Sequence, residues 1–350
     1  MASSNPKPKF EVREYTTHKN PAPASPSASI ILVSPTNEIL LLHRVKSSSA
    51  FPSAHVFPGG NLDPQDGELP SEPTDPARHK DSSAYRTGAI RELFEETGIL
   101  LAKESTSATS LLPVSPEARL AGRKAVHSGK ISFKDWLSSQ SKDAVLHTEG
   151  LIPFTHWVTP PNVPKRFTTQ MYLYFVHLKE TSNPSIHATA DQIETMAPEY
   201  RPAADWLRAA QAGDVILFPP QFILLYLASQ FLDRVDQLEG SKEIYGAKTT
   251  AMDIVKRRRA LYEFVTKPGQ NGGPAWSEKF ISPIGKGVQH DGRQALALGK
   301  PGPELKDSGL SGDEEYVVMV KFQKEGPRQL EVRRKSEVAE EGRKAKPEKL

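Results

Sequence analysis

The sequence predicts an α/β fold, in which a mixed β-sheet lies between helices and is followed by a C-terminal extension of helices and strands. Three observations predict it. Two apolar runs flank the turn-forming cluster Pro35-Thr36-Asn37, which is typical of a β-hairpin. Residues 82–98 repeat apolar positions with the period of an amphipathic helix. Residues 168–178 (TTQMYLYFVHL) are apolar enough for a buried core strand.

Other elements follow along the chain. Residues 1–27 are polar, proline-rich and aperiodic, so we expect a flexible arm. The hairpin then covers residues 27–45, and the helix begins at Ser82 or Ser83, which can cap it, and ends at Gly98. A further strand is expected at residues 150–160, and further helices are expected at residues 118–129, 201–212, 220–238 and 251–265.

The composition changes in the last third of the chain. Residues 267–313 are rich in glycine and proline, and residues 315–322 and 328–334 then predict two strands joined by a turn. The charged residues 335–350 are expected to be solvated. We therefore expect a main domain at residues 28–238 and a partly disordered extension at residues 239–350.

The composition also excludes several classes of protein and site. Lysine and arginine number 45 against 42 aspartates and glutamates, which argues against binding nucleic acid by bulk charge. The chain has no cysteine, so a metal would bind oxygen or histidine nitrogen. The longest nearly apolar run, residues 222–232, is shorter than the ~20 residues that span a bilayer.

The short apolar run and the two termini predict an intracellular protein without a membrane span. The N-terminus lacks the apolar segment of a secretory signal. The C-terminal Glu348-Lys349-Leu350 is similar to the peroxisomal Ser-Lys-Leu signal, but a glutamate replaces the serine. We therefore expect a cytoplasmic or peroxisomal location.

The helix before Gly98 has an acidic face. Helical spacing places Glu92, Glu95 and Glu96 within an arc of about 100°, with the apolar residues of the helix opposite. Like charges at this spacing destabilise a helix by about 0.2–0.5 kcal/mol per pair. Mg²⁺ or Mn²⁺ would offset the repulsion, because hard cations prefer carboxylate oxygens, and Arg91 could orient one carboxylate. The alternative is a solvated acidic face without a metal.

Residues 57–60 (FPGG) and 91–99 (RELFEETGI) together resemble the Nudix box, G-x5-E-x7-R-E-U-x-E-E-x-G-U, where U is aliphatic. Gly60 would be the first position, and residues 91–99 match the second half completely. Asp66 stands where the family has glutamate, and about seventeen residues are inserted at about residues 67–83. Either Asp66 or Glu68 would therefore take the role of the first acidic residue.

The interrupted box, preceded by SAHVFPGGNLD, is similar to the Nudix hydrolase branch that includes the peroxisomal coenzyme A diphosphatases of animals. The resemblance covers about residues 28–235. It implies a Nudix fold and metal-dependent hydrolysis of a nucleoside diphosphate derivative, with coenzyme A or an acyl-CoA as the expected substrate. Another diphosphate (a dinucleotide, a nucleotide sugar, capped RNA or a prenyl diphosphate) and a non-catalytic binding module are the alternatives.

The resemblance also implies the site residues. Mg²⁺ or Mn²⁺ would bind Glu92, Glu95, Glu96 and the carbonyl of Gly60. The expected catalytic residues are Glu92, Glu95 and Glu194, of which Glu92 and Glu194 compete for the role of base, with Glu149 as a third candidate.

Two arginines and several aromatic residues are further candidates. Arg44 and Arg166, at strand ends, are expected to bind substrate phosphates, although Arg44 could equally be an exposed strand residue. Trp157 and Phe167 could stack on an adenine, but core packing is favoured, and His55 is expected to be structural or to line the pocket. For the Lys256–Arg259 run, the solvated face of a docking helix is favoured over a nucleic-acid patch. The expected partner is thus a small-molecule diphosphate, and the oligomeric state stays open.

Overall fold

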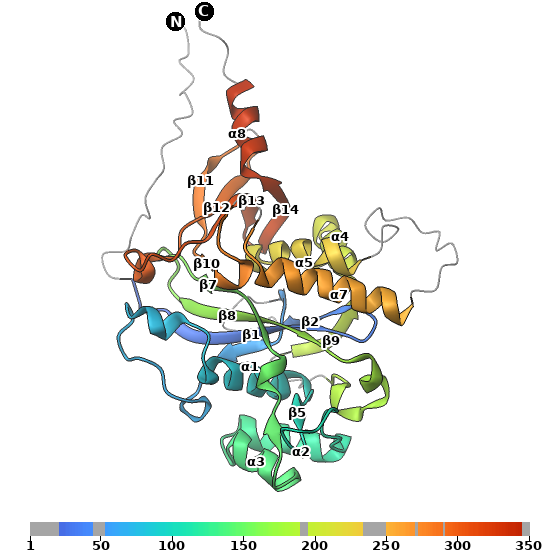
Figure 1. Cartoon of the computed structure of the whole chain (residues 1–350). Coiled ribbons are helices and arrows are strands. Elements are labelled where there is room, and N and C mark those ends of the chain that lie inside the picture. The colour runs from blue at the N-terminus through green and yellow to red at the C-terminus, as the bar shows by residue number, and fades with distance from the viewer. Residues whose placement is uncertain are drawn as a thin grey trace, which may run out of the picture.

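A computed structural model describes residues 21–44, 53–189, 195–233, 250–269, 272–289 and 291–344. At its centre lies a mixed sheet of eight strands (Figure 1). Six strands follow one another across this sheet in the order β10 (Phe280–Ile281), β7 (Ile152–Val158), β8 (Phe167–Phe175), β1 (Ser25–Val33), β2 (Ile39–Arg44) and β3 (His55–Val56). In addition, β4 (Gly59–Asn61) pairs with β1, and β9 (Thr195–Arg201) pairs with β2. Two pairs, β1 with β8 and β10 with β7, are parallel, which confirms the predicted mixed sheet.

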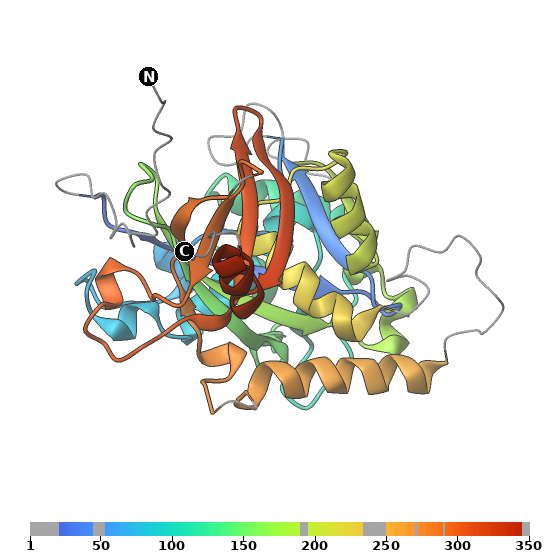
Figure 2. The ribbon, with the colours of Figure 1, turned by 90° about the horizontal axis from the view of Figure 1, so that it is seen from above.

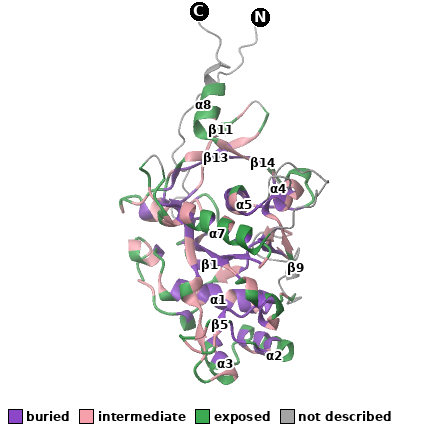
Figure 3. Cartoon of the chain, turned by 45° about the vertical axis from the view of Figure 1, so that its right-hand side comes forward, coloured by how far each residue is buried: buried purple, intermediate pink, exposed green. Residues whose placement is uncertain are grey.

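Helices cover both faces of this sheet because its strands alternate apolar side chains between them. Ile30 and Leu32 of β1 pack with α1 (Ser83–Thr97), whereas Ile31 and Val33 pack with α5 (Pro219–Leu232). On the side of α1 lie α2 (Pro116–His127) and α3 (Phe133–Gln140), and on the side of α5 lie α4 (Ala203–Ala212) and α7 (Ala251–Thr266). Most of β1 and α1 is buried between these layers (Figure 3).

The β1–β2 connection is the predicted hairpin. Val33 pairs with Ile39, and Asn37 takes the left-handed conformation that asparagine tolerates in turns, with φ 69°. Arg258 of α7 donates to the carbonyl oxygens of Ser34 and Val176 and to Asn37 Oδ1 at 2.5, 2.7 and 2.8 Å. Burial lowers the pKa of Arg258 to about 10. The docking of this helix is thus confirmed, and Lys256 and Arg259 are exposed as predicted, but Arg258 is buried rather than on a solvated face.

The extension is part of the same core, so residue 238 is not a boundary between separate cores. A four-stranded sheet of β11 (Ile284–Val288), β12 (Gln294–Leu298), β13 (Asp313–Gln323) and β14 (Gly326–Arg334) stands over α4 and α5 (Figure 2). Leu296, Val318 and Leu330 join the hydrophobic cluster that contains α5. The opposite face of this sheet receives Val338 of α8 (Lys335–Lys344). The glycine- and proline-rich stretch also holds β10, which extends the central sheet beside β7.

Several element boundaries differ from the prediction. β1 begins at Ser25, inside the expected arm. Gly59 and Gly60, for which no strand was predicted, lie in strand β4 and pair with Ser29 and Ala28. α1 ends as predicted at Gly98, which is left-handed with φ 72°, but the N-cap Ser82 makes no side-chain hydrogen bond to the helix.

The helices α3 and α8 were not predicted. Strands β4, β9, β10, β11 and β12 were not predicted either, nor was the two-stranded sheet of β5 (Ala102–Lys103) and β6 (Val145–Leu146). Within the described ranges, no helix is long and apolar enough to cross a membrane. Glu348-Lys349-Leu350 and residues 1–20 lie outside the described residues, so the expected location stays a prediction.

Candidate active site

The acidic face of α1 lies against β4. The apolar side of α1 packs on β1, and β4 pairs with β1 through Ala28 and Gly60, so β4 runs past the acidic edge of the helix. The amide of Gly59 donates to Glu96 Oε2 at 2.8 Å. Gly60 lies so close to Glu92 that a Cβ there would be 2.5 Å from Glu92 Cδ. The FPGG segment therefore contacts two of the predicted metal ligands.

Arg91 connects the acidic residues of the site. Its Nη1 donates to Glu92 Oε1 at 2.9 Å and to Glu95 Oε1 at 2.8 Å. Its Nε and Nη2 donate to the two carboxylate oxygens of Asp66 at 2.8 and 2.9 Å, and Nη2 also donates to the carbonyl of Asn61. The prediction that Arg91 orients a carboxylate is confirmed, and Arg91 holds three carboxylates, those of Asp66, Glu92 and Glu95.

Asp66, rather than Glu68, takes the place of the first acidic residue of the box. Its side chain is completely buried, whereas Glu68 is exposed. Asp66 ends the short helix η1 (Pro64–Asp66), where its carboxylate also accepts the amide of Asp63 at 2.8 Å. Gly88 of α1 leaves room for it, because a Cβ there would lie 2.9 Å from Asp66 Oδ2.

The insert leaves the site after Asp66 and returns to the sheet through η2 (Pro76–His79). His79 is buried, and its Nδ1 and Nε2 lie 2.7 Å from Thr168 Oγ1 and 2.8 Å from the carbonyl oxygen of Pro73. The insert is thus anchored to β8, and Asp66 and Arg91 on either side of it form a bidentate pair. Closing a longer loop costs little extra entropy, which makes this arrangement possible.

The site has an excess of negative charge among its described side chains. The four carboxylates of Asp66, Glu92, Glu95 and Glu96 face the guanidinium groups of Arg91 and of Arg44, whose Nη1 lies 3.8 Å from Glu96 Oε1. Burial raises the pKa of Glu92 to about 7, with Arg91 opposing this shift and Glu95 adding to it. A dication would balance this charge, and carboxylate and carbonyl oxygens are the donors that Mg²⁺ and Mn²⁺ prefer.

The donor chemistry therefore fits a hard dication. Among the described side chains, however, no three acidic or histidine groups are already gathered around one point as a ligand set. Arg91 lies between Glu92 and Glu95 and occupies one oxygen of each. Ligation would thus use Glu92 Oε2, Glu95 Oε2 and Glu96, together with the carbonyl of Gly60.

Helix α2 contributes residues that the sequence reasoning missed. Ser115 caps α2 by accepting the amide of Ala118, and Pro116 follows at the first helical position. Arg119 donates to the carbonyl of Gly98, and Arg123 donates to the carbonyls of Glu95 and Glu96, so both arginines satisfy the end of α1. His127 Nδ1 lies 3.2 Å from Glu95 Oε2. The spacing of Arg119, Arg123 and His127 by four residues places them on one face of the helix, and this pattern could have predicted the contact from the sequence.

Arg44 lies near the acidic face, and its binding of phosphate stays a prediction, whereas the prediction for Arg166 is wrong. The Arg166 side chain is fully buried. It forms an ion pair with Glu304 and donates to the carbonyl oxygens of Thr159 and Ala22 at 3.0 and 2.9 Å. These partners occupy all of its nitrogens, so Arg166 joins the N-terminal segment to the extension rather than binding phosphate.

Of the two alternative bases, the structure describes Glu149 alone. Glu149, in η3 (Thr148–Gly150), is 60% exposed and accepts a hydrogen bond from Lys103 at 3.1 Å, away from the acidic face. Glu194 lies outside the described residues.

The predicted aromatic candidates are mainly structural. Trp157 is 5% exposed and belongs to the core, which confirms the favoured interpretation. His55 stacks on His43 with ring centroids 4.5 Å apart, and burial lowers its pKa to about 4. Phe167 is half-buried and lies under the ammonium of Lys165 at 5.6 Å.

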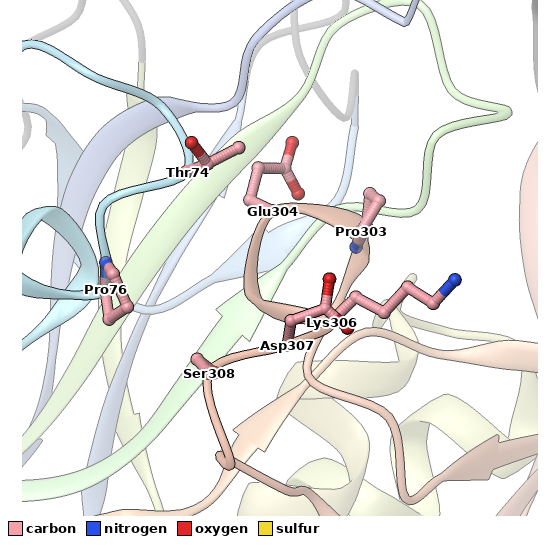
Figure 4. Close-up of a pocket in the computed structure, with 7 residues that line it drawn as sticks. All are labelled: Thr74, Pro76, Pro303, Glu304, Lys306, Asp307 and Ser308. Atoms are coloured by element: carbon pink, nitrogen blue, oxygen red, sulfur yellow. The ribbon is translucent and has the colours of Figure 1, made fainter.

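A cavity of about 310 Å³ lies where the insert and the extension meet (Figure 4). None of its lining residues belongs to the acidic face of α1: they are Thr74, Pro76, Pro303, Glu304, Lys306, Asp307 and Ser308. Its most buried carboxylate, that of Glu304, is already paired with Arg166. We therefore place the candidate site at the acidic face and not in this cavity.

Comparisons with known proteins agree with the motif. A family model described as the NUDT19 Nudix domain matches residues 71–226. A Caenorhabditis elegans protein that carries the name nudix hydrolase 7 is 31% identical over 211 residues, which cover 59% of this chain and 61% of that protein. A Gallus gallus protein named acyl-coenzyme A diphosphatase NUDT19 is 28% identical over 230 residues, which cover 53% of this chain and 59% of that protein.

The chain thus spans about three-fifths of the length of these two relatives. Among solved structures, a NUDIX hydrolase from Alicyclobacillus acidocaldarius is 22% identical, with a TM-score of 0.49, over 61% of this chain and 95% of that chain. The motif on α1, the family model and the two relatives thus agree that this chain is similar to the Nudix hydrolases, in a branch similar to the acyl-coenzyme A diphosphatase NUDT19.

Proposed function

We propose that this protein hydrolyses the diphosphate linkage of coenzyme A or of an acyl-CoA in a reaction that depends on Mg²⁺ or Mn²⁺. One observation carries the proposal: Glu92, Glu95 and Glu96 form one acidic surface that lies against the glycines of β4. Water would add across the P–O–P linkage, and the products would be a phosphopantetheine compound and adenosine 3′,5′-bisphosphate.

The residues of the chain would hold the reacting groups. Glu92, Glu95, Glu96 and the carbonyl of Gly60 would bind the dication, which when bound neutralises phosphate charge and lowers the pKa of water. Arg91 keeps the carboxylates in place through its bonds to Asp66. Arg44, at the rim of the acidic face, would bind a phosphate oxygen of the substrate.

Glu92 is the better supported candidate for the base within the described residues. Its carboxylate lies at the acidic face, 2.9 Å from Arg91 Nη1 and against Gly60. Glu194 remains the second candidate.

The substrate class is supported by similarity alone. The Gallus gallus relative is named as an acyl-coenzyme A diphosphatase, at 28% identity. The acidic face itself recognises a metal and a diphosphate, which a dinucleotide, a nucleotide sugar, capped RNA or a prenyl diphosphate would also present. A non-catalytic binding module is the alternative of a different class.

A hydrolysis screen by mass spectrometry tests the proposal. The full chain is incubated with Mg²⁺ or Mn²⁺ and with coenzyme A, acyl-CoA and the four competing classes of diphosphate. We expect 3′,5′-ADP from coenzyme A or acyl-CoA, and a loss of at least ~100-fold in the Glu95→Gln/Glu96→Gln double variant. Glu117→Gln, an exposed acidic residue of α2, is the matched control and should keep the wild-type rate.

Each outcome has a defined meaning. Turnover of another member of the panel would replace coenzyme A as the substrate. Full turnover in the double variant would overturn the site. No turnover of any compound would favour the binding module.

A further inference from the structure

His127 lies outside the Nudix motif and contacts one of its carboxylates. It is the last residue of α2, and its Nδ1 lies 3.2 Å from Glu95 Oε2. Glu95 Oε1 accepts a hydrogen bond from Arg91, so the two oxygens of this carboxylate face different partners. The His127 side chain is 45% exposed, compared with 11% for Glu95. The contact is therefore at the solvent edge of the acidic face, where an ion can enter.

The position of His127 is set by the docking of its helix. Arg119, Arg123 and His127 are spaced by four residues and share one face of α2. Arg123 Nη2 and Nε donate to the carbonyls of Glu96 and Glu95 at 2.7 and 3.0 Å, and Arg119 Nη1 donates to the carbonyl of Gly98 at 2.7 Å. These bonds bring the imidazole to Glu95 independently of any attraction between the two side chains.

We propose that His127 supplies a nitrogen ligand to the dication that binds Glu95, an inference that rests on the metal site of the proposed function. Two ligands that share an octahedral cation at about 2.1 Å lie about 3.0 Å apart. The 3.2 Å between Nδ1 and Oε2 is close to that separation. The carboxylate and the imidazole can therefore bind one ion with little movement of either helix.

A nitrogen ligand changes which metal the site prefers. Mg²⁺ is bound almost exclusively through oxygen, whereas imidazole is a good ligand for Co²⁺ and Zn²⁺ and is accepted by Mn²⁺. With His127 as a ligand, the preference of the site for transition-metal dications over Mg²⁺ is stronger than with the oxygen ligands alone.

The competing interpretation is a hydrogen bond in which Nδ1–H donates to Glu95 and orients it. The two interpretations differ in what a glutamine at residue 127 would do. Glutamine has an amide N–H that can still donate to Glu95, but it has no imidazole nitrogen. His127→Gln would therefore preserve an orienting contact and abolish nitrogen ligation.

The test uses the full chain with Mn²⁺ alone, without substrate. Pulsed electron paramagnetic resonance detects ¹⁴N coupled to bound Mn²⁺, and titration of the free-ion signal gives its Kd. We expect ¹⁴N coupling in the wild type and its loss in His127→Gln, with Kd for Mn²⁺ and for Co²⁺ raised about 10-fold or more. Kd for Mg²⁺, measured by competition, should change less than about 3-fold. His177→Gln, which removes an exposed imidazole beside η4 (Leu178–Ser182), is the control and should keep the coupling.

The outcomes separate this inference from the proposed function. Wild-type protein that binds Mn²⁺ and hydrolyses its substrate without ¹⁴N coupling would overturn the role of His127 alone. So would a His127→Gln variant that keeps the wild-type coupling and Kd. Wild-type protein that binds no Mn²⁺ would overturn both this inference and the metal-dependent function.

Discussion

The close approach of β4 to α1 predicts a specific effect of Gly60→Ala. A Cβ at residue 60 would lie 2.5 Å from Glu92 Cδ and 2.8 Å from Glu92 Oε1, whereas ordinary contacts of this kind are about 3.5 Å. The Glu92 carboxylate must therefore move by about 1 Å. The nearest atoms are the end of a flexible side chain, so the backbone can stay in place. A displacement of this size lowers the rate of an enzyme about 100-fold, while the unfolding free energy should change by about 1 kcal/mol or less.

Gly59→Ala is the matched control, because the same added methyl group meets backbone instead. Its Cβ would lie 2.6 Å from Ser29 Cα, and Gly59 has a φ of 155°, which side chains rarely adopt. This variant should lose stability because the pairing of β4 with β1 is strained.

The measurements are the initial rate of Mn²⁺-dependent acyl-CoA hydrolysis and the midpoint of thermal unfolding. We expect Gly60→Ala to lose rate and keep its midpoint, and Gly59→Ala to unfold at a lower temperature. A wild-type rate in Gly60→Ala would refute the reasoning, since the reaction would then not depend on the position of Glu92.

Three further predictions concern buried polar groups. Asp66→Ala leaves buried Arg91 without its bidentate partner and should lower the unfolding free energy in urea by about 3 kcal/mol; a change below about 1 kcal/mol would contradict this role. Burial lowers the pKa of His156 from 6.5 to about 3, so its folded form resists protonation and stability is lost as the pH falls below 6.5. From pH 7.5 to 5.5 the unfolding free energy of the wild type should therefore fall by about 1.4 kcal/mol relative to that of His156→Gln. Glu92, whose raised pKa favours the folded state in acid, contributes equally to both proteins and cancels in this comparison. A difference that stays constant with pH would contradict the lowered pKa of His156. Arg166→Met should lower the midpoint of thermal unfolding, because buried Glu304 loses its partner. The folded variant should keep the wild-type KM for the substrate. A raised KM at an unchanged midpoint would instead indicate that Arg166 binds substrate.

The interrupted box shows how an insertion can leave the acidic face of α1 and its contacts intact. The insert separates Asp66 from Arg91 by 25 positions, yet the two side chains form a bidentate pair. A shorter aspartate suffices in place of glutamate because η1 brings its backbone next to Gly88, where no side chain intervenes. The bonds of His79 to Thr168 and Pro73 hold the far end of the insert on the sheet, so the insert extends the molecule without opening the site.

Predictions that depend on neighbouring residues agree with the structure. The hairpin of β1 and β2, the helix α1 and the core strand β8 follow from apolar periodicity and turn residues, which act over a few positions. The convergence of Glu92, Glu95 and Glu96 on one face of α1 follows from helical spacing alone. Arg91 was assigned to orient a carboxylate for the same reason.

Predictions that depend on distant segments were less successful. Arg166 is paired with Glu304, 138 positions away, and no local pattern distinguishes this arrangement from a phosphate-binding arginine. No strand was predicted in the glycine- and proline-rich segment, but β10 pairs with β7 in the folded sheet. His127 was not considered, because its contact with Glu95 exists only when α2 packs against α1.

The sequence by itself therefore determined the fold class, the similarity to the Nudix family and the acidic face of α1, because helical and strand periodicity and the box are local properties of the chain. Tertiary structure decided which carboxylate Arg91 holds, which arginine remains at the site, and which histidine reaches Glu95. Those contacts join residues 25 to 138 positions apart. Their formation depends on how β4, α2 and the extension pack around the sheet, and packing of this kind leaves no periodic trace in the sequence.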